Sequence, residues 1–205
     1  MDNYLDELAK KYGTDKQTNA PGETKYHGYT TFYHDLLKNK RHEYTSILEI
    51  GVQNGFSHRM WRDYFPNAII YGIDITTTIR EERIFTIQGY QEDPVLLGEC
   101  FPGVEFDLII DDGGHTGWQQ QPSFRFLFPR LKKDRYYIIE DLETAYMREF
   151  RQFDDIRSST IYWMNSMLTD EPFSYYIPKE ELVELQKDIE DIYMHGQLGV
   201  FKKKC

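Results

Sequence analysis

Two groups of acidic residues in this sequence directly follow short apolar stretches. The first is the run from Asp111 to His115, and the second is Glu140 with Asp141. If the apolar stretches are neighbouring strands of a parallel sheet, their carboxyl ends share one edge and bring the acids together. Close carboxylates raise each other's pKa unless a cation lies among them. Oxygen ligands favour a hard cation such as Mg²⁺ over zinc.

The same residues also have a less specific interpretation. Acidic side chains are common in a chain with a net charge of −10, and a lone histidine is more often structural than catalytic. His115, however, follows the acids in a polar loop and does not lie on an apolar face. This position favours a role for His115 as a general base.

A glycine-rich turn follows an earlier apolar stretch. Gly51 and Gly55 let the backbone approach a ligand at the start of the next helix, although such turns often have only a packing role. The dinucleotide-binding pattern fails because Gln53 replaces its second glycine, and no Gly-Lys-Ser/Thr follows to form a P-loop. The spacing of Glu49, Gly51 and Gly55 is instead that of the nucleotide loop in S-adenosylmethionine enzymes.

Asp74 ends the next apolar stretch, where an acid can accept hydrogen bonds from the hydroxyl pair of a ribose. An isolated aspartate at a strand end is structural about as often as it binds a ligand. The preceding glycine turn favours a nucleoside ligand here. A nucleoside that carries a sulfonium and no phosphates also agrees with the few basic residues near these strand ends.

Apolar stretches alternate with helical patterns through the middle of the chain. This alternation predicts βαβ units, and so an α/β fold with a mostly parallel, seven-stranded sheet and helices on both faces. The last two strands, joined by His195 to Gln197, predict an antiparallel hairpin. The expected strands are Ser46–Gly51, Ala68–Asp74, Ile84–Ile87, Phe106–Asp111, Tyr136–Glu140, Ile189–Met194 and Leu198–Lys202, and the expected helices are Tyr4–Tyr12, one from near Thr30, Phe56–Phe65, Val95–Cys100 and Trp118–Leu131.

Length and charge narrow the class of protein. The 205 residues suit one domain, and 24 Lys+Arg against 34 Asp+Glu argue against nucleic acid or an anionic membrane surface as partner. No stretch approaches the roughly 18 apolar residues of a membrane span, the first residues lack the pattern of a signal peptide, and two cysteines cannot build a disulfide framework. We therefore expect a cytoplasmic protein without membrane insertion, and the sequence leaves its oligomeric state open.

The sequence resembles a class I S-adenosylmethionine-dependent methyltransferase, and more narrowly the Mg²⁺-dependent sugar O-methyltransferases of macrolide pathways. The most specific feature is the pairing of Asp-x-x-His with Glu-Asp at the next strand end. The resemblance is carried by Lys11–Lys16, His27–Thr30, Ile47–Val52, Tyr71–Ile75, Asp111–His115 and Ile139–Thr144. It implies one Rossmann-like methyltransferase domain, with residues 1–44 as a helical cap and 45–205 as the core. It leaves open whether the chain is a fragment of a longer carbohydrate enzyme.

The resemblance also implies a role for each site residue. Asp112, Glu140 and Asp141 would hold Mg²⁺ or a similar divalent cation, and His115 would be the general base. S-adenosylmethionine would contact Thr14, Glu49, Gly51, Gly55, Ser57, Asp74, Gln91 and Asp111.

These assignments predict transfer of a methyl group from the sulfonium to a hydroxyl of a sugar or glycoside, such as a rhamnose unit. Because a metal ion that binds vicinal hydroxyls would accept a catechol as well, a catechol-type O-methyltransferase is an alternative. A metal-dependent lyase or hydrolase on the same fold is a second alternative. A non-catalytic binding domain is a third, but it leaves the acids and His115 unexplained.

Overall fold

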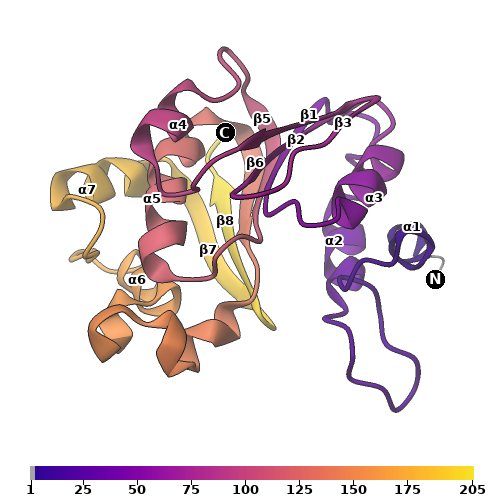
Figure 1. Cartoon of the computed structure of the whole chain (residues 1–205). Coiled ribbons are helices and arrows are strands. Elements are labelled where there is room, and N and C mark those ends of the chain that lie inside the picture. The colour runs from indigo at the N-terminus through magenta and orange to yellow at the C-terminus, as the bar shows by residue number, and fades with distance from the viewer. Residues whose placement is uncertain (1–2) are drawn as a thin grey trace.

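The computed structural model describes residues 3–205, without the side chain of Phe153, and these residues form one sheet with helices on both faces (Figure 1). The strand order is β3-β4-β2-β1-β5-β6-β8-β7. The pairs among β1, β2, β4, β5 and β6 are parallel, whereas β3, β7 and β8 are antiparallel to their neighbours. The expected Rossmann-like α/β fold with a terminal hairpin is confirmed.

The strand boundaries lie close to the expected ones. The sheet has eight strands instead of seven because a two-residue strand pairs with β4 at the sheet edge. β6 begins earlier than expected, because its polar first half is also extended: Leu131 pairs with Phe106 of β5, and the register shifts before the pairing resumes at Tyr136. The strands are β1 (Ser46–Ile50), β2 (Ile69–Asp74), β3 (Arg80–Glu81), β4 (Ile84–Gln88), β5 (Phe106–Asp111), β6 (Leu131–Ile139), β7 (Ile189–His195) and β8 (Leu198–Lys203).

The helices include all five that the sequence predicts. Helices α6 and α7 and a series of short 3₁₀ turns were not expected, and turns of three to five residues are too short to show helical periodicity. The helices are α1 (Tyr4–Tyr12), α2 (Tyr29–Leu37), α3 (Phe56–Tyr64), α4 (Pro94–Glu99), α5 (Gly117–Leu127), α6 (Thr160–Ser166) and α7 (Lys179–Lys187), and the 3₁₀ turns are η1 (Phe128–Arg130), η2 (Leu142–Tyr146), η3 (Arg148–Phe150), η4 (Gln152–Asp154) and η5 (Ile156–Ser158).

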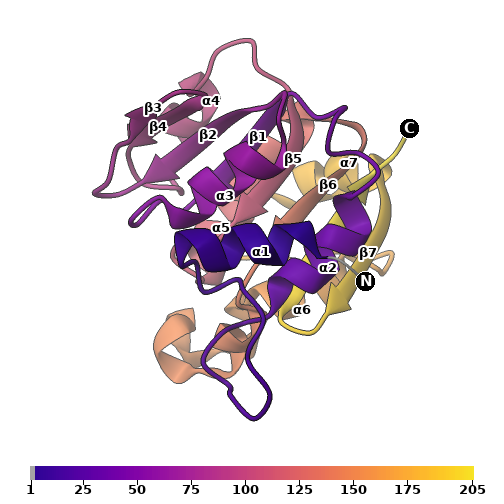
Figure 2. The same ribbon diagram turned by 90° about the vertical axis from the view of Figure 1, so that its right-hand side faces the viewer.

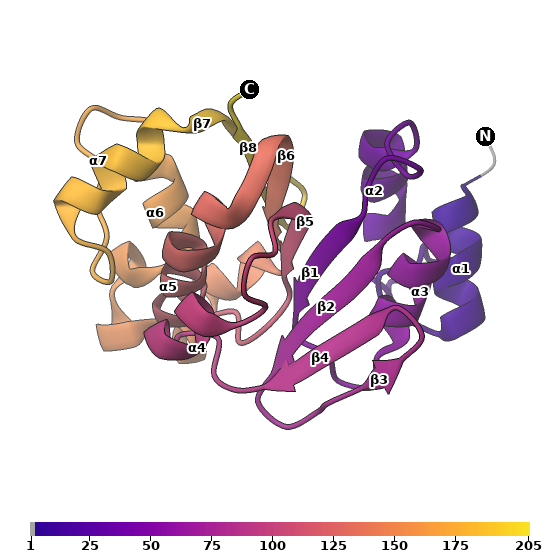
Figure 3. The ribbon, with the colours of Figure 1, turned by 90° about the horizontal axis from the view of Figure 1, so that it is seen from above.

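Each face of the sheet is covered by its own set of helices. Helices α1, α2 and α3 pack on one face and α4 to α7 on the other (Figures 2 and 3). On the first face, Tyr33 and Trp61 meet edge to face with ring centroids 5.1 Å apart; on the second, Phe124 packs on Trp163 at 5.0 Å. No helix within residues 3–205 is long and apolar enough to cross a membrane.

The two central strands are buried along their whole length. This burial explains their apolar sequences, because a strand covered on both faces has no solvent side for polar residues. Three acids are nevertheless buried: Asp107 near the start of β5, and Glu49 in β1 and Asp111 in β5, which are fully buried. The two last-named residues lie at the carboxyl ends of their strands, where the loops of the parallel sheet converge.

Asp6 fastens the N-terminal segment together. Its carboxylate accepts hydrogen bonds from the backbone N–H of Thr18 (2.7 Å) and the hydroxyl of Thr30 (2.6 Å), and it pairs with Lys10 at 2.7 Å. Burial alone would raise the pKa of Asp6, but the bonds from Lys10, Thr30 and Thr18 outweigh it and lower the pKa to about 2. One side chain thus joins α1, the following loop and α2.

Replacing this carboxylate should destabilise the protein. We expect Asp6→Asn to lower the free energy of unfolding by about 1–3 kcal/mol at pH 7, since an amide cannot satisfy the same donors. Because folding lowers the pKa of Asp6, its contribution is present above pH 3.8 and is lost as the pH falls towards 2. The difference between Asp6→Asn and wild type in urea unfolding should therefore shrink over this range. Asp35→Asn, at an exposed pair with Lys38, is the control, and an equal effect of both variants contradicts the account.

Candidate active site

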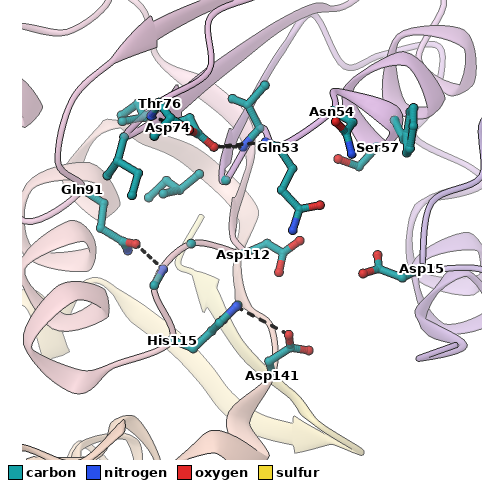
Figure 4. Close-up of a pocket in the computed structure, with 18 of the residues that line it drawn as sticks. Asp15, Gln53, Asn54, Ser57, Asp74, Thr76, Gln91, Asp112, His115 and Asp141 are labelled. Atoms are coloured by element: carbon teal, nitrogen blue, oxygen red, sulfur yellow. Dashed lines mark hydrogen bonds and ion pairs between the residues drawn. The ribbon is translucent and has the colours of Figure 1, made fainter. Parts of the chain in front are cut away.

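A cavity of about 500 Å³ lies beyond the carboxyl ends of the parallel strands (Figure 4). The expected site residues that line it are Thr14, Gly51, Ser57, Asp74, Gln91, Asp112, His115 and Asp141. Other lining residues, which the sequence did not single out, include Asp15, Gln53, Asn54, Phe56, Thr76 and Gln119. Four expected residues, Glu49, Gly55, Asp111 and Glu140, lie outside the lining.

Gly51 is required by a close approach between two loops. Its φ is +92°, and an added Cβ would lie 2.1 Å from the backbone oxygen of Asp112. The N–H of Asp112 also donates to the carbonyl of Ile50 at 3.0 Å. The space above Gly51 is therefore occupied by the loop after β5, which brings that loop against the glycine turn. Gly55 begins α3 with a φ of +70°.

Asp74 supports the glycine turn from the end of β2. One carboxylate oxygen accepts the N–H groups of Val52 (2.8 Å) and Gln53 (3.0 Å), and the other accepts those of Thr76 (2.8 Å) and Thr77 (2.9 Å). Burial would raise the pKa of Asp74, but these N–H groups outweigh it and lower the pKa to about 2. The hydroxyl of Thr76 is a fifth donor, at 3.0 Å. A carboxylate has about four acceptor positions, so a ribose hydroxyl would have to share a position or replace one of these donors. The ribose contact stays a prediction.

Gln91 fixes the loop that carries His115. Its side-chain oxygen accepts the N–H of Gly114 at 2.6 Å, and its nitrogen donates to Asp111 at 3.0 Å and to Ser123 at 3.1 Å. Burial raises the pKa of Asp111 to about 6, and the bond from Gln91 opposes this shift. Asp111 is thus placed to act through Gln91, which faces the cavity.

Three side chains in the cavity are close enough to share one metal ion. One ligand atom each from Asp112, His115 and Asp141 lies within 4.8 Å of the others. Nε2 of His115 is 3.7 Å from Asp141, and its Nδ1 is buried without a hydrogen-bond partner among the described residues. His115 and Asp141 both have a φ of +59°, a left-handed conformation that is rare for non-glycine residues and concentrated at functional sites.

Asp141 is held from a second side by residues to which the sequence assigns no role, although His27 and Tyr29 lie in a stretch that carries the resemblance. The hydroxyl of Tyr29, at the start of α2, donates to Asp141 at 2.6 Å and lies 3.0 Å from the side-chain oxygen of Gln197. Nδ1 of His27 is 3.5 Å from the same carboxylate. The N-terminal segment and the turn of the β7–β8 hairpin therefore meet at this acid.

Lys16 lies in one of the stretches that carry the resemblance, but the sequence assigns it no role at the site. Its ammonium lies 2.6 Å from Asp112, 2.5 Å from Glu140 and 3.5 Å from Glu49, with 1% of its side chain exposed. The other oxygen of Glu140 accepts the hydroxyl of Tyr33 at 2.7 Å. Both oxygens of Glu140 are thus engaged below the cavity. Its role as a Mg²⁺ ligand stays a prediction, and because Glu140 lies outside the cavity lining, one of its remaining lone pairs would have to reach the cation from below.

Burial and charge act against each other in this buried group. Burial alone would lower the pKa of Lys16, but the charges of Asp112, Glu140 and Glu49 outweigh it and raise the pKa well above its usual value. Burial also raises the pKa of Asp112 and Glu140. The pKa of Glu49 falls to about 2, because the charges of His58 and Lys16 beside it outweigh its burial.

Sequence signals for Lys16 were weak. It lies in a polar loop without periodicity, and only the excess of acids at the strand ends indicated that a cation is needed there. A Mg²⁺ ion is the cation that the sequence predicts there, and the structure adds Lys16 to it.

Comparison with known proteins identifies relatives of the chain. No protein-family model matches it. It is 36% identical over 152 residues to the 8-demethyl-8-(2-methoxy-alpha-L-rhamnosyl)-tetracenomycin-C 3'-O-methyltransferase of Streptomyces olivaceus, which covers 69% of this chain and 37% of that protein. It is 36% identical over 157 residues to the mycinamicin VI 2''-O-methyltransferase of Micromonospora griseorubida, which covers 71% of this chain and 38% of that protein. The chain thus spans well under half the length of these relatives.

A solved structure resembles the whole chain. The MycE methyltransferase from the mycinamycin biosynthetic pathway, in complex with Mg and SAH, superimposes with a TM-score of 0.83 at 29% identity, over 98% of this chain and 54% of that one. The strand order, the cavity at the strand ends and these similarities all indicate the same fold family. The chain belongs to the class I methyltransferases, and its homologues are sugar O-methyltransferases of macrolide and tetracenomycin pathways.

Proposed function

We propose that this chain is the catalytic part of an S-adenosylmethionine-dependent, divalent-metal-dependent O-methyltransferase. Its acceptor is a hydroxyl of a sugar, such as a rhamnose unit, in a glycoside or glycan. The name of the tetracenomycin relative includes a rhamnosyl group, and that of the mycinamicin relative gives O-methylation at position 2''. We also propose a cytoplasmic location, and a single domain in which residues 1–44 form a helical cap and residues 45–205 form the core.

One observation carries the proposal. The glycine turn after β1 and the group formed by Asp112, His115 and Asp141 line the same cavity. A volume of about 500 Å³ lies within the usual range for small-molecule sites. A donor at the glycine turn and an acceptor at the acids would therefore meet in one space, as a transfer reaction requires.

The residues present fit both absent groups. The carboxylates of Asp112 and Asp141 face the cavity and offer the oxygen ligands that a divalent cation such as Mg²⁺ prefers. The ring of His115 lies beside them, with Nε2 3.7 Å from Asp141, where a base for the acceptor hydroxyl is needed. The side chains of Gln53 and Asn54 line the cavity beside the glycine turn and offer amide groups to a nucleoside. When bound, the donor would supply an electrophilic methyl group, and the cation would polarise the acceptor hydroxyl.

The chain's own residues then have separate tasks. Asp112 and Asp141 hold the cation on the cavity side, with Glu140 as a further predicted ligand. His115 accepts the proton of the acceptor hydroxyl at a ring nitrogen. Gln91 and Asp74 keep the two loops in place, so the donor and acceptor lie in line before reaction.

Methyl transfer itself tests the activity. We expect tritium from labelled S-adenosylmethionine to enter rhamnosides, to stop on addition of EDTA and to resume with excess Mg²⁺, because the acids alone cannot stabilise the developing alkoxide. The panel includes catechols. Transfer to catechols only would support the alternative acceptor. Transfer that is unaffected by EDTA would show that the reaction needs no metal. No transfer to any acceptor would contradict the proposed function.

Donor affinity tests the glycine turn. Asp74→Asn should weaken binding of S-adenosylhomocysteine about 5- to 100-fold in calorimetry, because an amide nitrogen cannot accept the backbone N–H groups that shape the turn. Asp93→Asn is a matched control, since Asp93 accepts the N–H groups of Val95 and Leu96 at the start of α4, away from the cavity. Equal donor affinity in both variants contradicts the role of Asp74.

The base is tested by a variant that separates catalysis from binding. His115→Ala should lower kcat by about 10²–10⁴-fold, since a positioned base contributes that much, while Mn²⁺ and donor affinities stay near wild type. His42→Ala, at an exposed histidine, is the control. A His115→Ala protein that loses Mn²⁺ would make the histidine a ligand instead, and one with wild-type kcat would remove it from the reaction.

A further inference from the structure

Four acids surround the end of the central strands, and one lysine lies among them, with the ring of His58 3.0 Å from Glu49 on its far side. Glu49, Asp112 and Glu140 contact Lys16 directly, and Asp141 follows Glu140 in the chain. One ammonium, with one imidazole beside Glu49, cannot balance four carboxylates. The cluster therefore has excess negative charge even with Lys16 in place.

The geometry divides this cluster into two halves. The deep half consists of Glu49 and Glu140, which are at most 1% exposed, together with Lys16. The cavity half consists of Asp112 and Asp141, which line the cavity with 26% and 18% of their side chains exposed. Asp112 belongs to both halves, because one of its oxygens bonds to Lys16.

The lysine is fixed by its own backbone. The N–H of Thr30, in α2, donates to the carbonyl of Lys16 at 3.1 Å, and the N–H of Gly28 donates to that of Gln17 at 3.0 Å. The preceding residues, Thr14 and Asp15, line the cavity. Lys16 is therefore part of the docked N-terminal segment and not a side chain that moves freely into the cluster.

We propose that Lys16 is a positioning residue that neutralises the deep half of the carboxylate cluster and so limits the cluster to one divalent cation, bound on the cavity side. This inference rests on the proposed function, because it takes the cation site at Asp112 and Asp141 as given.

The physical reason is the high free energy of unpaired buried charge. Without the ammonium, the buried carboxylates of Glu49 and Glu140 and the partly exposed one of Asp112 would face one another, and the buried pair would need a proton or another cation. A divalent cation would satisfy them, since they offer only oxygen ligands. Removing the lysine should therefore increase the demand for metal.

The test is a count of bound Mn²⁺ on the full chain, by electron paramagnetic resonance of free Mn²⁺ and by calorimetry. We expect one Mn²⁺ per chain for wild type. Lys16→Met, which keeps the length of the side chain but removes its charge, should bind a second Mn²⁺ or bind one at least tenfold more tightly. Lys11→Met, which breaks an exposed pair with Asp63, should behave as wild type.

A double variant separates charge from packing. Lys16→Met with Glu49→Gln removes one positive and one negative charge outside the cavity, and it should return the Mn²⁺ count and affinity to wild type. If Lys16→Met alone fails to fold, recovery of folding in the double variant, or on addition of Mn²⁺, supports the proposal. Failure of both variants to fold in either condition overturns it, because packing and not charge would then be what Lys16 supplies.

The outcomes also separate this inference from the proposed function. A wild-type chain that binds no Mn²⁺ removes the metal from the proposed function. A wild type that binds one Mn²⁺ while Lys16→Met binds it with the same count and affinity overturns the role of Lys16 alone. Two Mn²⁺ on wild type overturns it as well.

Discussion

Negative charge at the carboxyl ends of β1, β5 and β6 is the constraint to which the rest of the site is fitted. The parallel sheet brings Glu49, Asp112 and Glu140 to one place, and burial makes their repulsion strong because little water screens it. Lys16 supplies a positive charge from a different part of the chain. The N-terminal segment is thus joined to the sheet through this ion cluster as well as through apolar packing.

The loops around the cavity are held in a similar manner, by buried polar groups that bind backbone N–H groups. Asp74 holds the glycine turn, and Gln91, supported by Asp111, holds the loop that carries His115. Each of these side chains forms its hydrogen bonds with other groups of the protein. The groups left to face the cavity are those with capacity to spare, among them Asp112, His115 and the amides of Gln53 and Asn54. Rigid support of this kind keeps a transfer site in register.

The sequence predicted the sheet well because buried strands need apolar runs, and Phe106–Asp111 was placed without error. It also placed the acids at one edge, since parallel strands end together. It could not show that Lys16 pairs with Asp112 and Glu140, because an ion pair between residues far apart in the chain leaves no local pattern. Nor could it show that Asp74 is saturated by N–H donors, which depends on how two loops fold back. The added strand β3 has only two residues, too few for an alternating pattern.

Donor, metal and base are expected to meet in the cavity beyond the strand ends. A crystal structure of the chain with S-adenosylhomocysteine and Mn²⁺, using anomalous scattering from the metal and the donor's sulfur, tests this arrangement directly. We predict a Mn²⁺ peak beside Asp112 and Asp141, a sulfur peak between the glycine turn and His115, and Lys16 still in contact with Glu140. A Mn²⁺ peak away from these acids, or a donor bound outside the cavity, would contradict it.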